Sequence, residues 1–195
     1  MTKEEYKKKK LDLYRRITDN KWFDEIDAIN SKICKKCGGT CCMVFPCAFS
    51  TGDFIDINDI DYMKSILDTG YFVIDSFVKY TDSEIVYYIR VRSKEEEAIV
   101  VRKGKRGSEC SLHTKDGCML DFYTRPTQGS LLIPCMNRYG LGVCDDEYDY
   151  KTMYNDWSEH QDVMKVLVDY YYNKEMAPKS SKVNKLSKII RKDEI

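Results

Sequence analysis

The sequence predicts an α+β fold, with N-terminal helices, a cysteine-rich metal loop, a small antiparallel sheet and a long C-terminal helix. Three patterns carry this prediction. Apolar side chains recur at helical spacing near both ends, runs rich in Val, Ile, Tyr and Phe fill the middle, and five of the nine cysteines gather in one short segment. A chain of 195 residues is long enough for one domain with its own core.

The first predicted element is a helical lead-in over residues 1–31. Residues 3–31 are expected to form two helices or one kinked helix, because the apolar stripe breaks near Asp19 and Asn20. The stripe consists of Leu11, Tyr14, Ile17, Trp22, Phe23, Ile26 and Ile29. Such a stripe must pack on something, and we expect it to pack on the body of the same domain.

The middle of the chain predicts one helix and then several strands. Residues 58–69 have helical periodicity and stop at Gly70, a residue typical of helix C-termini. The strand-like runs are 71–78, 84–92, 98–102 and 130–135. From Tyr88 to Arg92 apolar and polar residues alternate, which predicts a half-exposed antiparallel strand. Asp116-Gly117 predicts a tight turn between two cysteines.

The most regular predicted helix covers residues 149–175. Its apolar stripe is expected to be core: Met153, Trp157, Met164, Leu167 and Tyr171. We therefore expect one cysteine-cluster domain over 1–177, in which a metal-binding core over 34–144 is followed by this packing helix. A basic tail covers 178–195.

Charge and hydropathy limit the class of protein. The net charge is zero, with +4 in residues 1–16 and +4 in residues 178–195, which leaves −8 between them. No apolar run approaches the roughly 18 residues of a membrane span, and the N-terminus lacks the apolar segment of a secretory signal. The sequence thus predicts no membrane partner and a cytoplasmic location. Nucleic acid could bind the basic termini, but without a recognition motif solvated ends are favoured.

The cysteines form two groups. The first is Cys34, Cys37, Cys41, Cys42 and Cys47, and the second is Cys110 and Cys118 with Cys135 and Cys144 further on. Thiols stay reduced in the cytosol, so metal ligation by at least four thiolates is favoured over disulfides. Neither a pair of zinc knuckles nor the bacterial ferredoxin run is present, and the spacing does not separate zinc from iron. Side chains of adjacent residues usually point in different directions. Cys41 and Cys42 are therefore expected to bind metals at two nearby sites, or one of them is expected to bind the metal while the other only contacts a ligand.

A set of separated motifs resembles a known family. Cys34-Lys-Lys-Cys37-Gly-Gly-Thr-Cys41-Cys42, then Cys110, Gly117-Cys118 and Arg125-Pro126, is similar to the YkgJ-like cysteine-cluster (CxxCxxCC) proteins, which chelate zinc or iron. A bacterial branch shares the further Cys47 and the stretch 129–134. The resemblance covers about residues 34–135 and implies metal or iron–sulfur ligation without a defined reaction. A flagellin lysine methylase carries a similar cluster.

The family motif and the thiolate count together predict the ligands. Cys37, Cys41, Cys42 and Cys118 are expected to be required, with Cys34, Cys47, Cys110 and Cys144 close behind. Family members often carry a cysteine soon after Arg-Pro; here residues 127–130 have none, so another ligand such as Cys47 or Cys144 is needed. Cys135 and His113 remain open as ligands or packed residues. Arg125 is expected to offset the negative charge of the cluster.

The sequence predicts a metal-binding protein that holds a zinc ion or an iron–sulfur cluster. We expect an accessory, redox or regulatory module with a protein partner. The alternative is an enzyme that modifies protein side chains, methylase-like or redox, with the cluster at or near its active site. No G-x-G-x-x-G, phosphate loop or Ser-His-Asp signature supports an enzyme. A thiol–disulfide oxidoreductase is disfavoured because Cys34-x2-Cys37 follows a predicted helix and enters a glycine loop.

Overall fold

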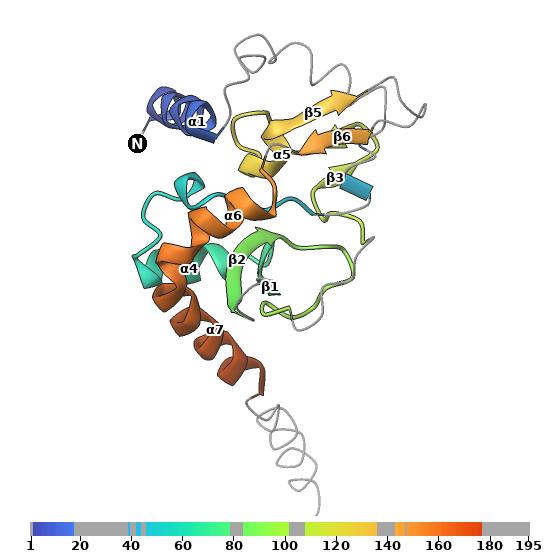
Figure 1. Cartoon of the computed structure of the whole chain (residues 1–195). Coiled ribbons are helices and arrows are strands. Elements are labelled where there is room, and N and C mark those ends of the chain that lie inside the picture. The colour runs from blue at the N-terminus through green and yellow to red at the C-terminus, as the bar shows by residue number, and fades with distance from the viewer. Residues whose placement is uncertain are drawn as a thin grey trace, which may run out of the picture.

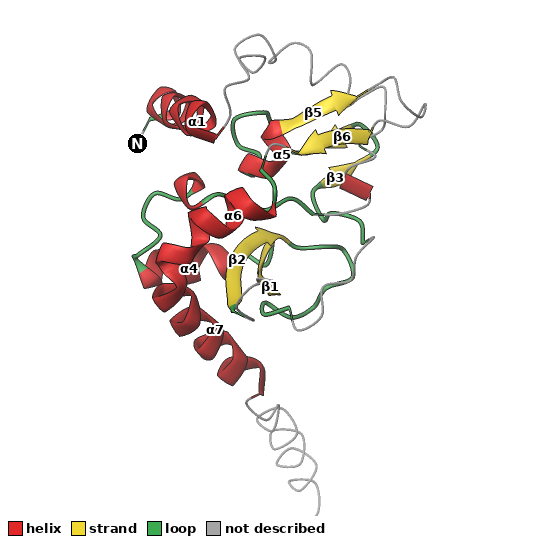
Figure 2. Cartoon of the chain, in the orientation of Figure 1, coloured by secondary structure: helices red, strands yellow, loops and turns green. Residues whose placement is uncertain are grey.

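The computed structural model has the α+β architecture that the sequence predicts, with helices gathered on one side of short antiparallel strands (Figures 1 and 2). The structure describes residues 2–17, 39, 42–43, 46–78, 84–101, 108–135, 143–146 and 148–176. The predicted helix over 18–31, the side chains of Cys34, Cys37 and Cys41, and the basic tail over 178–195 lie outside the described residues.

The main sheet is built on the strands β1 (Phe72–Val78) and β2 (Ile85–Val91), which pair antiparallel with Ile74 opposite Ile89. Residues 47–49 line the free edge of β2, where Phe49 N donates to Ile89 O at 2.9 Å and Val91 N donates to Cys47 O at 3.1 Å. The first cysteine group therefore leads directly into the sheet.

Of the strand predicted over 98–102, the described residues 98–101 form only an isolated bridge. Residues 99–101 run parallel to β1 and form a single bridge between Val100 and Ile74. Ile74 N donates to Ile99 O at 2.8 Å, but Ile99 N donates outward to Glu175 Oε1 at 2.6 Å. This segment thus closes the β1 edge by joining the sheet to the C-terminal helix.

The second half of β2 is buried rather than half-exposed. Arg90 is 6% exposed, and its Nε donates to Asp75 Oδ2 at 2.6 Å. Its Nη1 donates to Glu96 Oε2 at 2.9 Å, so Asp75 and Glu96 together neutralise the guanidinium. The alternation of apolar and polar residues predicted that Arg90 is exposed, because arginine is usually at the surface. The carboxylates that allow its burial come from outside the strand, so the pattern within the strand gave no sign of them.

The predicted helix over 149–175 is interrupted. It comprises α6 (Tyr150–Trp157), a 3-10 turn η4 (Ser158–His160) and α7 (Gln161–Met176). The turn places the Gln161 amide against β2, where its Oε1 accepts from Tyr87 N at 2.9 Å and its Nε2 donates to Tyr87 O at 3.0 Å. The side-chain amide thereby continues the hydrogen-bonding pattern of the strand edge.

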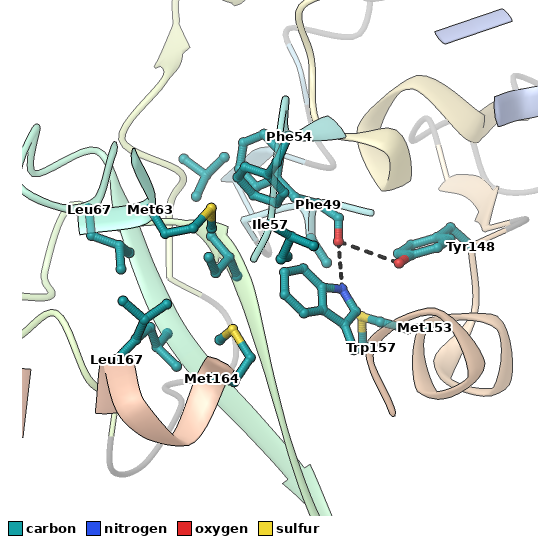
Figure 3. Close-up of a cluster of buried hydrophobic side chains, with 14 of the residues drawn as sticks. Phe49, Phe54, Ile57, Met63, Leu67, Tyr148, Met153, Trp157, Met164 and Leu167 are labelled. Carbon is teal, nitrogen blue, oxygen red and sulfur yellow. Dashed lines mark hydrogen bonds between the residues drawn. The ribbon is translucent and has the colours of Figure 1, made fainter. Parts of the chain in front are cut away.

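The core lies between these helices, the sheet and α4 (Ile60–Leu67), as Figure 3 shows. Every residue of the predicted C-terminal stripe is buried: Met153, Trp157, Met164, Leu167 and Tyr171. Trp157 Nε1 donates to Phe49 O at 2.9 Å, which satisfies the indole while its rings fill the core (Figure 3).

The helix predicted over 58–69 is confirmed, and Gly70 adopts φ +81° after it. Among the described residues, no helix is long and apolar enough to cross a membrane.

The N-terminal helix α1 (Lys3–Ile17) is held by a buried ion pair that the sequence did not predict. Lys10 is fully buried and forms an ion pair with Asp53. Asp53 also accepts from Thr127 N at 2.9 Å and from Ser50 N at 3.0 Å. Lys10 Nζ donates to Arg125 O at 3.0 Å. These contacts join α1, the 3-10 turn η3 (Thr51–Asp53) and α5 (Thr127–Leu131).

Two small hairpins complete the described chain. In one, β3 (His113–Thr114) pairs with β4 (Gly117–Cys118), so the tight turn predicted at Asp116-Gly117 is confirmed. In the other, β5 (Leu132–Cys135) pairs with β6 (Val143–Asp146). The strand predicted over 130–135 begins later, because residues up to Leu131 belong to α5.

Candidate metal centre

The backbone of the cysteine-rich loop lies directly against the second cysteine group. Cys110 N donates to Cys42 O at 2.7 Å, although the two residues are far apart in sequence. The helical turn at 42–43 accordingly lies beside β3 in Figure 1. The loop backbone at Cys42 is therefore in direct contact with the Cys110 region, and shared ligation by the two groups stays a prediction.

Gly39 shows how closely the two segments approach. Its φ of +72° lies in the left-handed region that favours glycine. A Cβ atom at this position would stand 2.9 Å from His113 Cδ2, 3.0 Å from His113 Nε2 and 3.3 Å from Gly117 Cα. Glycine is thus required both by the backbone conformation and by the contact with the β3–β4 hairpin.

The β3–β4 hairpin presents Cys118 and His113 on one face. These residues are directly opposite each other in the antiparallel register, and directly opposite side chains project to the same side. The turn between them is fixed by Thr114 Oγ1, which donates to Gly117 O at 2.9 Å, and by Gly117 itself at φ +100°. Both side chains therefore extend from a short, well-defined hairpin.

His113 is held by a carboxylate. Its Nδ1 lies 2.7 Å from Glu109 Oε1, and its side chain is only 9% exposed. Glu109 also forms an ion pair with Lys94. Hydrogen bonds from Lys94 and His113 lower the pKa of Glu109, so this residue is a carboxylate near neutral pH. The imidazole is consequently fixed in orientation, with Nδ1 toward Glu109.

Cys110 lies opposite Ser93 in an isolated antiparallel bridge. The flanking bonds run from Ser111 N to Arg92 O at 3.0 Å and from Lys94 N to Glu109 O at 2.9 Å. The bridge is therefore a non-hydrogen-bonded pair, whose side chains lie close on the same face. Ser93 is buried, and hydrogen bonds from its backbone N–H and its side chain help to lower the pKa of Glu96.

The remaining predicted ligands are distributed over other elements. Cys47 is buried and packs on α5, where a Cβ at Gly129 would come within 3.2 Å of its Sγ. Gln128 fixes this contact, since its Oε1 accepts from Ala48 N at 2.8 Å. Cys144 lies on β6 opposite Pro134. Among the described residues, no three His, Cys, Asp or Glu side chains are grouped as metal ligands.

Arg125 reaches back toward the second cysteine group. Its Nε donates to Leu120 O at 3.0 Å, and its own N donates to Asp121 O at 3.1 Å. Leu120 follows Cys118 by two residues, so the guanidinium is anchored in the chain that leaves the hairpin. Whether it also neutralises thiolates stays a prediction.

The sequence did not predict two of the polar contacts described above, one at the N-terminal helix and one at the hairpin. The Lys10–Asp53 ion pair gave no signal, because charged residues are ordinarily exposed. The contact between Glu109 and His113 had a weak signal in their spacing of four residues, but that spacing indicates contact only in a helix, and β3 begins at His113.

Comparisons of the chain with protein-family models, with curated proteins and with solved structures found no match. The resemblance to the YkgJ-like cysteine-cluster family therefore stays a prediction.

Proposed function

We propose that this chain binds a zinc ion or an iron–sulfur cluster through cysteines of both groups and acts as an accessory, redox or regulatory module. The observation that carries the proposal is the contact between the two cysteine segments. The Cys42–Cys110 backbone hydrogen bond and the fit of Gly39 against the hairpin bring the segments together. A shared metal centre explains why nine cysteines, most of them in these segments, occur in one chain.

Polar groups beside Cys110 and Cys118 support an anionic thiolate centre. Several thiolates on one metal leave a net negative charge, which nearby hydrogen-bond donors stabilise. Ser93 lies opposite Cys110 in the isolated bridge with its side chain on the same face, so its hydroxyl is beside one of the proposed ligands.

The proposed ligands are those that the sequence predicts. Cys37, Cys41, Cys42 and Cys118 would hold the centre, with Cys34, Cys47, Cys110 and Cys144 as further or second-site ligands. A bound zinc would supply a rigid cross-link, and a bound iron–sulfur cluster would supply one-electron exchange. Three features of the chain support such a centre. Gly39 lets the cysteine loop lie close to the β3–β4 hairpin, the hairpin carries Cys118, and Arg125 is anchored by its hydrogen bond to Leu120 O.

A cytoplasmic location and a protein partner belong to the same proposal. Reduced thiols are available for metal only where disulfides do not form. An accessory or regulatory module acts through another macromolecule, and its docking changes when the centre is loaded or changes oxidation state.

Anaerobic purification followed by metal analysis and an absorption spectrum tests the proposal. We expect either stoichiometric zinc in a colourless protein, or iron and sulfide in a brown protein with a broad shoulder near ~400 nm. Protein that holds neither metal after purification from metal-replete cells would refute it.

A further inference from the structure

We propose that Arg92 and Ser111 form a binding site for a phosphoryl group, beside the exposed ring of Tyr71. The two residues lie opposite each other where the chain continues past the end of β2. This proposal goes beyond the proposed function, because it uses neither a metal nor a cysteine.

The placement of the two side chains follows from the backbone. Ser93 and Cys110 form an isolated antiparallel bridge, so one step along each strand places Arg92 opposite Ser111. Ser111 N donates to Arg92 O at 3.0 Å, which agrees with this register. Directly opposite side chains project to the same face, and successive residues of a strand project to opposite faces. Arg92 and Ser111 therefore share one face, and Cys110 lies on the other.

Both side chains contain a buried polar atom that lacks a partner. Arg92 Nε and Ser111 Oγ are buried and have no hydrogen-bond partner among the residues that the structure describes. Arg90, two residues earlier, shows the usual arrangement, since its Nε donates to Asp75 Oδ2 at 2.6 Å and its Nη1 donates to Glu96 Oε2 at 2.9 Å. A buried polar atom without a partner costs free energy, so two of them on neighbouring residues indicate a place for a ligand that accepts hydrogen bonds.

The donors fit a phosphoryl group better than a carboxylate. A guanidinium is always charged, and its planar fork donates to two oxygens of one anion. The Ser111 hydroxyl adds a third donor from the neighbouring strand. A phosphoryl group has three terminal oxygens that accept such bonds, whereas a carboxylate has two. The pair thus favours phosphate, free or joined to an organic group.

The face that carries this pair is reached from solvent at Tyr71. Arg92 N donates to Tyr71 O at 2.8 Å, one step beyond the last pair of the β1–β2 ladder, so the two side chains are on the same face. Tyr71 is 54% exposed. An aromatic group joined to the phosphate is therefore placed to pack against the Tyr71 ring.

Isothermal titration calorimetry of the full-length protein at constant ionic strength tests the site, with inorganic phosphate, phenyl phosphate and acetate as probes. We expect saturable binding of phosphate, and weaker binding of acetate. Tighter binding of phenyl phosphate would support an aromatic phosphate ester as the natural ligand, and equal binding would support free phosphate. Failure of both phosphates to bind, or binding of acetate as tight as that of phosphate, would overturn the proposal.

Substitutions assign the binding to these residues. Arg92→Gln should weaken phosphate binding about 10–100-fold, because hydrogen bonds to a charged group are lost, and Ser111→Ala should weaken it less. Arg16→Gln is the matched control, since it removes an exposed arginine from the last turn of α1 and should bind phosphate as the wild type does. Equal affinity of wild type and Arg92→Gln would overturn the proposal.

A measurement of thermal stability gives a readout that does not depend on calorimetric affinity. Arg92→Met keeps an unbranched apolar stem and removes the guanidinium, so packing of the stem is largely retained. Phosphate stabilises most proteins by its exclusion from their surface, and this effect should be the same in both proteins. Binding at the site adds to it only in the wild type, whose melting temperature should therefore rise more on addition of phosphate. An equal rise in the two proteins would overturn the proposal.

Discussion

Replacing Gly39 with alanine tests whether the cysteine loop is seated on the β3–β4 hairpin. The added Cβ would stand 2.9 Å from His113 Cδ2 and 3.3 Å from Gly117 Cα, in a backbone conformation with φ +72°. That conformation costs alanine about 1–2 kcal/mol. His113 is held by Glu109 and Gly117 presents backbone, so neither gives way easily, and overpacking adds about 1–3 kcal/mol.

Gly70→Ala is the matched control for this variant. Gly70 also has a positive φ, +81°, but nothing lies within 4 Å of a Cβ added there. The free energy of unfolding of Gly70→Ala should therefore fall only by the conformational cost of about 1–2 kcal/mol. The difference between the two variants therefore measures the contact between loop and hairpin.

Urea unfolding of both variants at matched metal loading is the assay, with the slope of the transition checked for two-state behaviour. We expect Gly39→Ala to be the less stable of the two by about 1–3 kcal/mol and to release metal faster. Equal destabilisation of the two variants, with equal metal off-rates, would refute the argument that the loop is docked on the hairpin.

Three further predictions concern the buried Lys10–Asp53 ion pair, the N-cap of α6 and Arg125. Asp53→Asn leaves the Lys10 ammonium buried without its carboxylate, so the free energy of unfolding should fall by about 3–5 kcal/mol in urea titrations; a loss no larger than that of a surface ion pair would contradict this. The Thr152 backbone N–H holds the pKa of Asp149 below its usual range, so this N-cap contributes about 1 kcal/mol at neutral pH and loses that contribution as pH falls through the lowered pKa. The stabilities of wild type and Asp149→Ala should thus converge in acid, and a gap independent of pH would argue against the cap. Arg125→Lys should keep the fold but release metal faster, and Arg125→Ala faster still, because the planar guanidinium is lost; identical off-rates to a chromogenic chelator would leave Arg125 with a packing role only.

Elements whose burial follows from local periodicity were predictable from the sequence. The stripe from Met153 to Tyr171 is buried throughout, and the antiparallel pairing of β1 with β2 follows from two adjacent β-branched and aromatic runs. The turn at Gly117 was likewise predictable, because Asp-Gly favours the positive φ that it adopts.

Features that depend on remote partners were not predictable. The buried positions of Arg90 and Lys10 depend on carboxylates supplied from other elements, and no local pattern indicates such a pairing. The 3-10 turn before Gln161 contains neither glycine nor proline, and its role becomes visible only beside Tyr87. At the candidate site, the sequence predicted that two cysteine segments meet, but not that a histidine held by Glu109 lies at the meeting point.

The melting temperature before and after anaerobic removal of the metal tests the central claim most directly. If the centre takes ligands from both cysteine segments, it cross-links the loop to the hairpin, and a structural zinc site of this kind contributes on the order of 10 kcal/mol to folding. The account predicts a large fall in melting temperature when a strong chelator strips the metal, with recovery when it is restored. Stripped protein that melts at an unchanged temperature would contradict the claim, because the metal would then be peripheral to the fold.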